Sequence, residues 1–398
     1  MEVDLTHNKN NQYISGYSIY KTKTNPISVS LNKKTLIVNW DNNEQSNYHF
    51  LWLRDNCHCD ECVTTLSKEQ IFEICDVPFD IKPLSVELSK DNMINITWDY
   101  NSHKSIYHPA WLKKHCYSKK AREKRNLKYK VWDQKRIKKE LPLYEYEDVM
   151  NKDDILLNCL YELRDYGISK ILNVKNKLNE VKEVAQKISF IRETNFGTVF
   201  DVISKKSANS AAYTNLKLPL HTDLPTRELQ PGLQFLHCLV NDATGGESIL
   251  VDGFKIAEYM REKHNDDYIA LSTLSMSFYN KDKTSDYRFV SPMIITNNND
   301  EIKEIRMANF LRGPIDIPAE KIEVFYKAYR LFILLTRDEQ FQFVERLNKG
   351  DLIVFDNRRI LHARNSFDLK NGERHLQGCY IDKDELLSKI RILEREQM

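Results

Sequence analysis

Apolar and polar residues alternate along the first third of the chain, and this alternation predicts short β-strands. It is clearest in five segments, residues 27–32, 35–40, 47–53, 83–88 and 93–98. The first two segments flank Lys33 and Lys34 and are typical of a hairpin. A short helix is expected to begin near Pro109, because proline is tolerated in the first turn of a helix.

Helical periodicity appears after about residue 145. Leu156, Leu160 and Leu163 fall on one face of a predicted helix, and Gly167 is a suitable residue to end it. Further helices are predicted over residues 176–188 and 384–396, and strands over residues 168–172, 232–240, 351–356 and 375–381. Numerous strands with a few covering helices favour a mainly β fold with α-helices, a double-stranded β-helix (jelly roll).

The change of pattern predicts three parts. Residues 1–117 form a small, mostly β N-terminal domain, residues 118–144 a basic linker, and residues 145–398 the jelly-roll domain. The segment 118–140 is rich in lysine and arginine and has no clean apolar period. A solvated connection between domains explains it, and contact with an acidic partner is the alternative.

Composition narrows the class of protein. The 398 residues carry a net charge of +2 with 29% charged residues, so no global basicity indicates nucleic acid or a membrane surface. The polar N-terminus lacks the apolar region of a secretory signal, and no apolar run approaches the ~20 residues of a membrane span. A cytoplasmic location is expected.

A His-x-Asp motif carries the first candidate chemistry. In extended chain, residues i and i+2 point to the same side, so His221 and Asp223 can reach one metal ion. His362, after an apolar strand, would complete the two-histidine, one-carboxylate triad that leaves iron positions open. Arg374 suits the carboxylate of a co-substrate, and Ser248 can donate a hydroxyl to it. The chance alternative is a capping motif with an unrelated histidine and arginine.

Three cysteines crowd together at Cys57, Cys59 and Cys62. In a reducing compartment such spacing indicates a metal site, and tetrahedral zinc with one further ligand fits it better than an iron–sulfur cluster. His58 and His108 lie close in sequence. With four protein ligands such a zinc would be structural.

Longer segments around these motifs resemble one family. The segments AYTNLKLPLHTDLP, LQFLHC, GGESILVDGF, FDNRRILHARNSF and RHLQGCY, with WLRDNCHCDEC and WLKKHCYSKKAR near the front, are similar to the γ-butyrobetaine hydroxylase and trimethyllysine hydroxylase family, in the taurine-dioxygenase superfamily. The resemblance runs over nearly the whole chain.

The resemblance implies an iron(II) enzyme that uses 2-oxoglutarate and dioxygen, with ascorbate as reductant, and that forms a homodimer. It implies Arg374 and Ser248 as 2-oxoglutarate ligands and His103 as the fourth zinc ligand. Hydroxylation of γ-butyrobetaine to L-carnitine is the leading expectation. Trimethyllysine or a trimethylammonium phosphonate remain alternatives. A non-catalytic jelly roll that binds quaternary ammonium compounds is the rival from another class.

A quaternary ammonium group is recognised by aromatic faces. By resemblance, the cage is Phe196, Phe200, Tyr213 and Tyr380. Phe196 and Phe200 also have helical spacing, so a core role is an equal alternative for these two.

The opposite, anionic end of the substrate departs from the family pattern. Ser210 stands where γ-butyrobetaine hydroxylases have an asparagine that helps bind the substrate carboxylate. Asn309 is the candidate for the second asparagine of that site, and Arg312 lies nearby. The resemblance therefore implies a retained cage and an altered anion site.

Overall fold

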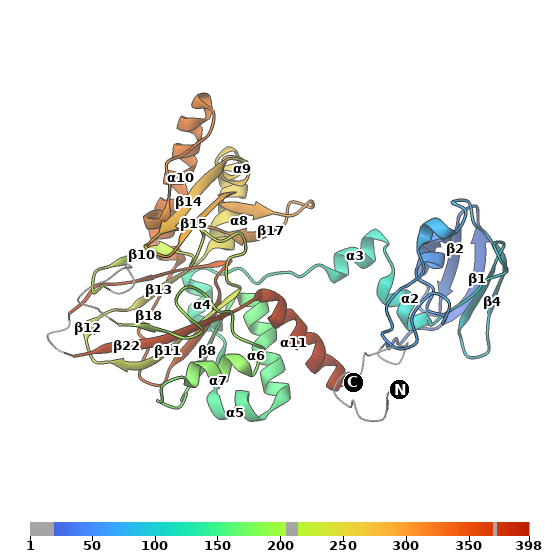
Figure 1. The fold of residues 1–398 in the computed structure, drawn as a ribbon, viewed down its shortest axis with the longest axis horizontal. Helices are drawn as coiled ribbons and strands as arrows, with labels where there is room; N and C mark the ends of the chain where they lie inside the picture. The colour runs from blue at the N-terminus through green and yellow to red at the C-terminus, as the bar shows by residue number, and fades with distance from the viewer. Residues whose placement is uncertain (1–19, 204–213, 369–371, 398) are drawn as a thin grey trace. The chain divides into compact units, whose positions relative to one another are not determined.

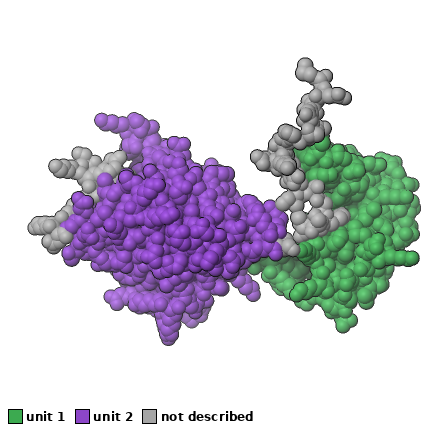
Figure 2. Space-filling model, turned by 90° about the horizontal axis from the view of Figure 1, so that it is seen from below, with its two compact units in different colours: residues 1–127 green, residues 128–398 purple. Residues whose placement is uncertain are grey.

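The computed structural model describes residues 20–203, 214–368 and 372–397. The chain separates into two compact units, Met1–Leu127 and Lys128–Met398, coloured separately in Figure 2. Within the described ranges, no helix combines the length and apolar character that crossing a bilayer requires.

The first unit contains two three-stranded antiparallel sheets, ordered β1-β2-β3 and β4-β5-β6. Both contribute to one core that includes Trp40, Tyr48 and Trp98. The elements are β1 (Pro26–Asn32), β2 (Thr35–Trp40), β3 (Gln45–His49), α1 (Phe50–Asp55), η1 (Ile74–Asp76), β4 (Pro83–Leu88), β5 (Ile94–Trp98), β6 (Lys104–Tyr107), α2 (Pro109–His115) and α3 (Lys119–Arg125).

One predicted strand of this unit is wrong in its second half. The segment 47–53 leaves the sheet at His49 and continues as α1. The imidazole Nδ1 of His49 accepts the backbone N–H of Leu51 and caps the helix. Phe50 and Leu53 are then buried on the helix rather than on alternate faces of a strand. The other predicted strands and the helix at Pro109 are confirmed, with ends shifted by at most one residue.

The second unit is built on a six-stranded sheet, β7-β8-β19-β11-β22-β9, and a four-stranded sheet, β10-β20-β13-β18. One buried cluster contains residues from both, including Leu250 of β13 and Phe355 of β19. The strands are β7 (Leu143–Glu145), β8 (Ile168–Leu172), β9 (Phe200–Val202), β10 (Leu218–His221), β11 (Leu233–Asn241), β12 (Thr244–Gly245), β13 (Ser248–Asp252), β18 (Gln342–Glu345), β19 (Leu352–Asp356), β20 (Ile360–Arg364), β21 (Phe367–Asp368) and β22 (Arg374–Ile381).

Four helices cover the six-stranded sheet (Figure 1). The apolar face predicted for Leu156, Leu160 and Leu163 is buried there, and the helix ends at Gly167 in the left-handed conformation, with φ 73°. The predicted helix at 176–188 forms over a shorter stretch. These helices are α5 (Tyr146–Asn151), α6 (Asp153–Tyr166), α7 (Glu180–Gln186) and α11 (Lys383–Glu396).

A second group of elements, which contains both helices and strands, was not predicted from the sequence. It lies between β13 and β18 in the chain and packs around Phe254, Phe325 and Phe332. Its elements are α8 (Gly253–Lys263), α9 (Asn265–Thr273), β14 (Ser275–Lys281), β15 (Asp286–Pro292), β16 (Ile294–Thr296), β17 (Ile302–Ile305), η3 (Asn309–Leu311), η4 (Ala319–Lys321), α10 (Ile322–Arg337) and η5 (Glu339–Phe341).

The basic segment 118–144 differs from a fully solvated linker. Its first part forms α3, and its second part belongs to the second unit, where α4 (Gln134–Glu140) follows the buried Trp132. The backbone N–H of Trp132 donates to Asp252 at 3.0 Å. Lysine and arginine dominate the composition here, but two apolar side chains, Trp132 and Ile137, decide the packing.

Candidate functional site

The two histidines of the predicted triad come from neighbouring strands. His221 ends β10 and pairs directly with His362 of the antiparallel strand β20. Asp223 follows two residues after His221. Its Oδ1 lies 3.1 Å from Nε2 of His221 and 3.6 Å from Nε2 of His362. Cis ligands about 2.1 Å from an octahedral ion are about 3 Å apart, so the three atoms have the spacing of one metal site.

Hydrogen bonds orient each part of this triad. Nδ1 of His221 donates to the carbonyl of Pro219 at 2.8 Å, which leaves Nε2 as the free donor atom for a metal. The backbone N–H of Asp223 donates to Oδ1 of Asn357 at 2.7 Å, and the amide of Asn357 donates back to the carbonyl of Asp223 at 3.0 Å. The hydroxyl of Tyr380 donates to Oδ2 of Asp223 at 2.6 Å.

The surroundings of His362 and Asp223 favour the protonation states in which these two residues bind a metal. Burial and the neighbouring His221 lower the pKa of His362 to about 3. Burial alone would raise the pKa of Asp223, but His362, His221 and the Tyr380 hydroxyl outweigh it and lower that pKa. Neutral imidazoles and an ionised carboxylate are the forms that ligate a cation.

A cavity of about 380 Å³ opens onto the triad. Asn195, Asn280, Lys281 and Phe310 line it, although the sequence motifs did not indicate them. Its described lining includes Asn195, Phe196, Phe200, Val202, Leu218, His221, Asp223, Leu224, Gln234, Leu236, Ser248, Asn280, Lys281, Asp282, Phe310, Leu311, His362, Ala363, Arg364, Arg374, Leu376 and Tyr380.

Two arginines and Ser248 line this cavity. Arg364 pairs with Ser248 across β20 and β13, and Arg374 begins β22. Burial lowers the pKa of each arginine to about 10, so both remain charged at neutral pH. Nε of Arg374 is buried without a partner among the described residues. Gly246 leaves room for this side chain, because a Cβ there would lie 3.0 Å from Arg374.

Arg364 was missed by the sequence reasoning. Its signal is the spacing His362-x-Arg364 on one strand, which puts both side chains on the same face. Its guanidinium donates to the carbonyls of Thr214 and Leu216 at 2.6 and 2.9 Å. Arg364 thus joins the cavity to the segment that leads into β10.

Aromatic rings form another wall of the cavity. The rings of Phe200 and Tyr380 are 5.0 Å apart, inclined by 31°. Gly378 makes this possible, because a Cβ there would lie 2.6 Å from the Phe200 ring. Phe196 also lines the cavity, so both phenylalanines face it rather than a closed core. Tyr213 lies outside the described residues.

Of the two residues predicted for the anion site, the structure describes only Asn309. Ser210 lies outside the described residues. Asn309 is exposed and is absent from the described lining; its Oδ1 instead accepts the Tyr329 hydroxyl at 3.2 Å. The next two residues, Phe310 and Leu311, line the cavity in its place. The loose sequence match in this region therefore did not indicate which side chains line the cavity.

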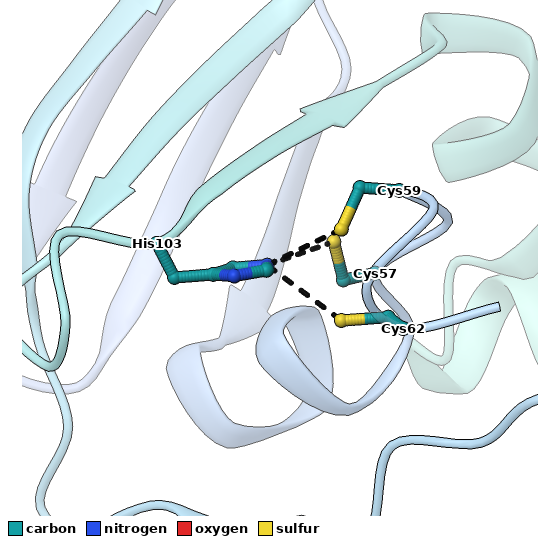
Figure 3. A group of neighbouring side chains, drawn as sticks. All are labelled: Cys57, Cys59, Cys62 and His103. Atoms are coloured by element: carbon teal, nitrogen blue, oxygen red, sulfur yellow. Dashed lines mark hydrogen bonds between the residues drawn. The ribbon is translucent and has the colours of Figure 1, made fainter.

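The N-terminal cluster brings together Cys57, Cys59, Cys62 and His103 (Figure 3). The three sulfurs lie 3.4, 3.6 and 3.6 Å from Nε2 of His103. A tetrahedral zinc with Zn–S near 2.3 Å and Zn–N near 2.0–2.1 Å has S···N edges of about 3.5 Å. Nδ1 of His103 contacts Glu61 at 3.0 Å, which fixes the ring in the way that outer-shell carboxylates fix zinc ligands.

Burial favours the neutral thiol form of these cysteines, so thiolates would require a bound cation. Burial and the neighbouring Cys57 raise the pKa of Cys62 to about 12, and burial also raises the pKa of Cys57. The two other histidines considered as ligands have different contacts. His58 packs against Trp111 with ring centres 5.1 Å apart, and Nδ1 of His108 caps α2.

Two family models match the chain. One, "Taurine catabolism dioxygenase TauD, TfdA family", matches residues 137–380, and the other, "Gamma-butyrobetaine hydroxylase-like, N-terminal", matches residues 27–113. Each model lies within one of the two structural units.

Full-length relatives carry related names. A γ-butyrobetaine dioxygenase of Pseudomonas sp. (strain AK-1) is 48% identical over 358 residues, 90% of this chain and 93% of that protein. The Homo sapiens γ-butyrobetaine dioxygenase is 34% identical, over 89% of this chain and 93% of that one. A trimethyllysine dioxygenase of Meyerozyma guilliermondii is 29% identical, over 92% of this chain and 95% of that one.

Proposed function

The chain belongs to the taurine catabolism dioxygenase TauD, TfdA family, and we propose that, as a 2-oxoglutarate-dependent dioxygenase of this family, it hydroxylates γ-butyrobetaine to L-carnitine. One observation carries the proposal: an iron-type triad and an aromatic wall line the same cavity. The names of the Pseudomonas and human relatives support this substrate.

The donor set of the cavity fits iron(II) and 2-oxoglutarate. His221, Asp223 and His362 would hold the metal, whose ligand type and open positions are those of non-haem iron oxygenases. Arg374, whose buried Nε has no partner among the described residues, would hold the distal carboxylate of 2-oxoglutarate with Ser248 beside it. When bound, the iron and 2-oxoglutarate supply the oxidant for inserting one oxygen atom of dioxygen into a C–H bond.

The chain's own residues then select and orient the substrate. Phe196, Phe200 and Tyr380 would contact the trimethylammonium group, together with Tyr213, which the resemblance assigns to the same cage. A cation held at this wall would present a fixed carbon toward the triad.

Lys281 is the candidate for the anionic end of the substrate. Arg374 and Arg364 belong to the 2-oxoglutarate side, so Lys281 is the remaining cation of the described lining, and it forms no salt bridge among the described residues. Oδ1 of Asp282 is already occupied by Thr284 and Ser285 of its own turn. A zwitterion such as γ-butyrobetaine would suit a cavity whose described lining holds an aromatic wall and this lysine.

Succinate release tests the proposal. The purified protein with iron(II), ascorbate and 2-oxoglutarate is given γ-butyrobetaine, trimethyllysine or trimethylaminoethylphosphonate in turn. We expect fastest turnover with γ-butyrobetaine, detection of L-carnitine by mass spectrometry, and no product from His221→Ala. Faster turnover of trimethyllysine or trimethylaminoethylphosphonate would identify that compound as the substrate instead. Binding of these compounds without succinate release would favour the non-catalytic binder.

Further features belong to the same proposal. Cys57, Cys59, Cys62 and His103 would hold a structural zinc in the N-terminal domain, residues 1–117. The two sheets that share a core would form the double-stranded β-helix of the catalytic domain, residues 145–398. We also propose a homodimer in the cytoplasm.

A further inference from the structure

Tyr380 uses its ring and its hydroxyl for different contacts. The side chain is buried, only 3% exposed, and lines the cavity. Its ring stands beside that of Phe200, and its hydroxyl donates to Oδ2 of Asp223 at 2.6 Å. One side chain therefore joins the aromatic wall to the metal triad.

The two carboxylate oxygens of Asp223 have separate surroundings. Oδ1 faces the two histidines, at 3.1 and 3.6 Å, while Oδ2 accepts the tyrosine hydroxyl. Asn357 holds only the backbone of Asp223, through its N–H and its carbonyl. Rotation of the carboxylate about its own side-chain bonds is thus restrained by Tyr380.

We propose that Tyr380 is a positioning residue for the metal as well as a wall of the cation cage. Its hydroxyl holds Oδ2 so that Oδ1 faces the metal, and its ring face takes the quaternary ammonium group. The ring role rests on the proposed function, whereas the hydroxyl role requires only a divalent cation at the triad. Hydrogen bonds to ligating carboxylates typically affect metal affinity about 10- to 100-fold.

Substitutions at Tyr380 separate the two roles. Tyr380→Phe keeps the ring and removes the hydroxyl, and Tyr380→Leu removes both. Mn(II) is the probe, because it prefers oxygen and nitrogen ligands to the thiolates of the N-terminal cluster. The free ion is followed by electron paramagnetic resonance during titration. The affinity for γ-butyrobetaine is measured by calorimetry at saturating Mn(II) and 2-oxoglutarate.

We expect Tyr380→Phe to bind Mn(II) about tenfold more weakly, with its γ-butyrobetaine affinity changed less than twofold once Mn(II) is saturating. Tyr380→Leu should lose affinity for both ligands. Placing 4-aminophenylalanine at position 380 restores a donor and should recover most of the Mn(II) affinity, an effect that a purely structural role would not produce.

Tyr161→Phe is the matched control. In the wild type, the hydroxyl of Tyr161 also donates to a carboxylate, that of Glu394, at 2.7 Å. Tyr161 is absent from the described cavity lining. This variant should bind Mn(II) like the wild type. Wild-type Mn(II) affinity in Tyr380→Phe would overturn the hydroxyl role. If γ-butyrobetaine fails to bind or react while the Mn(II) difference persists, the proposed substrate fails and the positioning role stands.

Discussion

At the scale of single residues, the site depends on polar side chains whose partners are distant in sequence. Asn357 holds the backbone of Asp223, and Arg364 holds the segment before β10. Arg374 has a buried Nε with no partner among the described residues. A buried guanidinium is stabilised by a nearby anion, which agrees with the proposal that Arg374 binds a co-substrate carboxylate.

Arg374→Met should raise the KM for 2-oxoglutarate about 30-fold or more. The substitution leaves a co-substrate carboxylate buried without its charged donor, a loss of about 2–5 kcal/mol. Steady-state kinetics at varied 2-oxoglutarate concentration measure this KM. Arg288→Met, which removes an exposed arginine paired with Asp286, is the control and should behave as wild type. An unchanged KM in Arg374→Met would exclude this carboxylate site.

Lys281→Ala should raise the KM for γ-butyrobetaine about two- to fivefold with a smaller change in kcat, because an exposed lysine contributes a screened attraction. Lys283→Ala is the control, since Lys283 is exposed in the same turn and outside the described lining. Added salt should reduce the difference between wild type and Lys281→Ala. Equal KM values in the two variants would argue against an anion site at Lys281.

At the scale of elements, one buried ion pair holds the start of β20, the strand that carries His362. Arg359 and Asp252 are both buried, and Nη2 of Arg359 lies 2.7 Å from Oδ2 of Asp252. Asp252 also caps α8, and Arg359 donates to the carbonyls of Asp165 and Lys130. This pair therefore connects β13, β20 and the segment before α4.

Asp252→Asn should destabilise the protein by about 3–5 kcal/mol, because it leaves the buried Arg359 without its counter-charge. Urea unfolding measures the loss. Asp286→Asn removes the partner of the exposed Arg288 and should leave the urea midpoint nearly unchanged. Similar midpoints for the two variants would show that the Arg359 network contributes little to stability.

His237 on β11 should contribute a pH dependence to stability. It is fully buried with no partner for either ring nitrogen among the described residues, and burial lowers its pKa below 6.5 despite the opposing charge of Glu180. Below about pH 6.5 the unfolded chain gains this proton while the folded protein does not. The contribution of His237 to the free energy of unfolding is therefore complete above about pH 6.5, and it declines as the pH falls toward the pKa of the folded protein.

His237→Leu should flatten the fall in unfolding free energy between about pH 6.5 and 5, measured by urea titrations at several pH values. Part of this pH dependence should remain in His237→Leu, because other buried histidines, such as His362, also have lowered pKa values. His264→Leu, at an exposed residue, is the control. If the slope of His237→Leu equals that of the wild type, His237 takes up a proton in the folded state.

At the scale of the whole molecule, the chain combines two units with separate cores and separate candidate metal sites. Trp40 and Trp98 belong to the core of the first unit, and Trp132 to that of the second. The first unit has small sheets and a loop that carries the cysteine cluster, so a metal bound there would contribute more to its stability than a metal in the larger unit.

Removal of zinc should unfold the first unit selectively. Chelation, or Cys57→Ser, should remove the protection of its amides in peptide-resolved hydrogen exchange, while residues 128–398 keep theirs. Cys75→Ser is the matched control, because Cys75 is exposed and lies outside the cluster. Unchanged protection of residues 20–127 after complete chelation would mean that the cluster does not need a metal to fold.

The sequence by itself determined the features that depend on local spacing. The period of Leu156, Leu160 and Leu163 specified α6, and alternation specified most strands, because these patterns follow directly from backbone geometry. The pairs His221–Asp223 and Cys57–Cys59 indicated metal chemistry because two-residue spacing already brings ligands together.

The tertiary structure decided what depends on contacts between distant segments. It brought Tyr380 to Asp223 and put Lys281 in the cavity wall, whereas Asn309, expected there, forms a hydrogen bond with Tyr329. Such side chains carry no periodic signal, since their positions follow from how sheets, turns and helices pack. For the same reason, the burial of Trp132 overrode the basic composition of the segment around it.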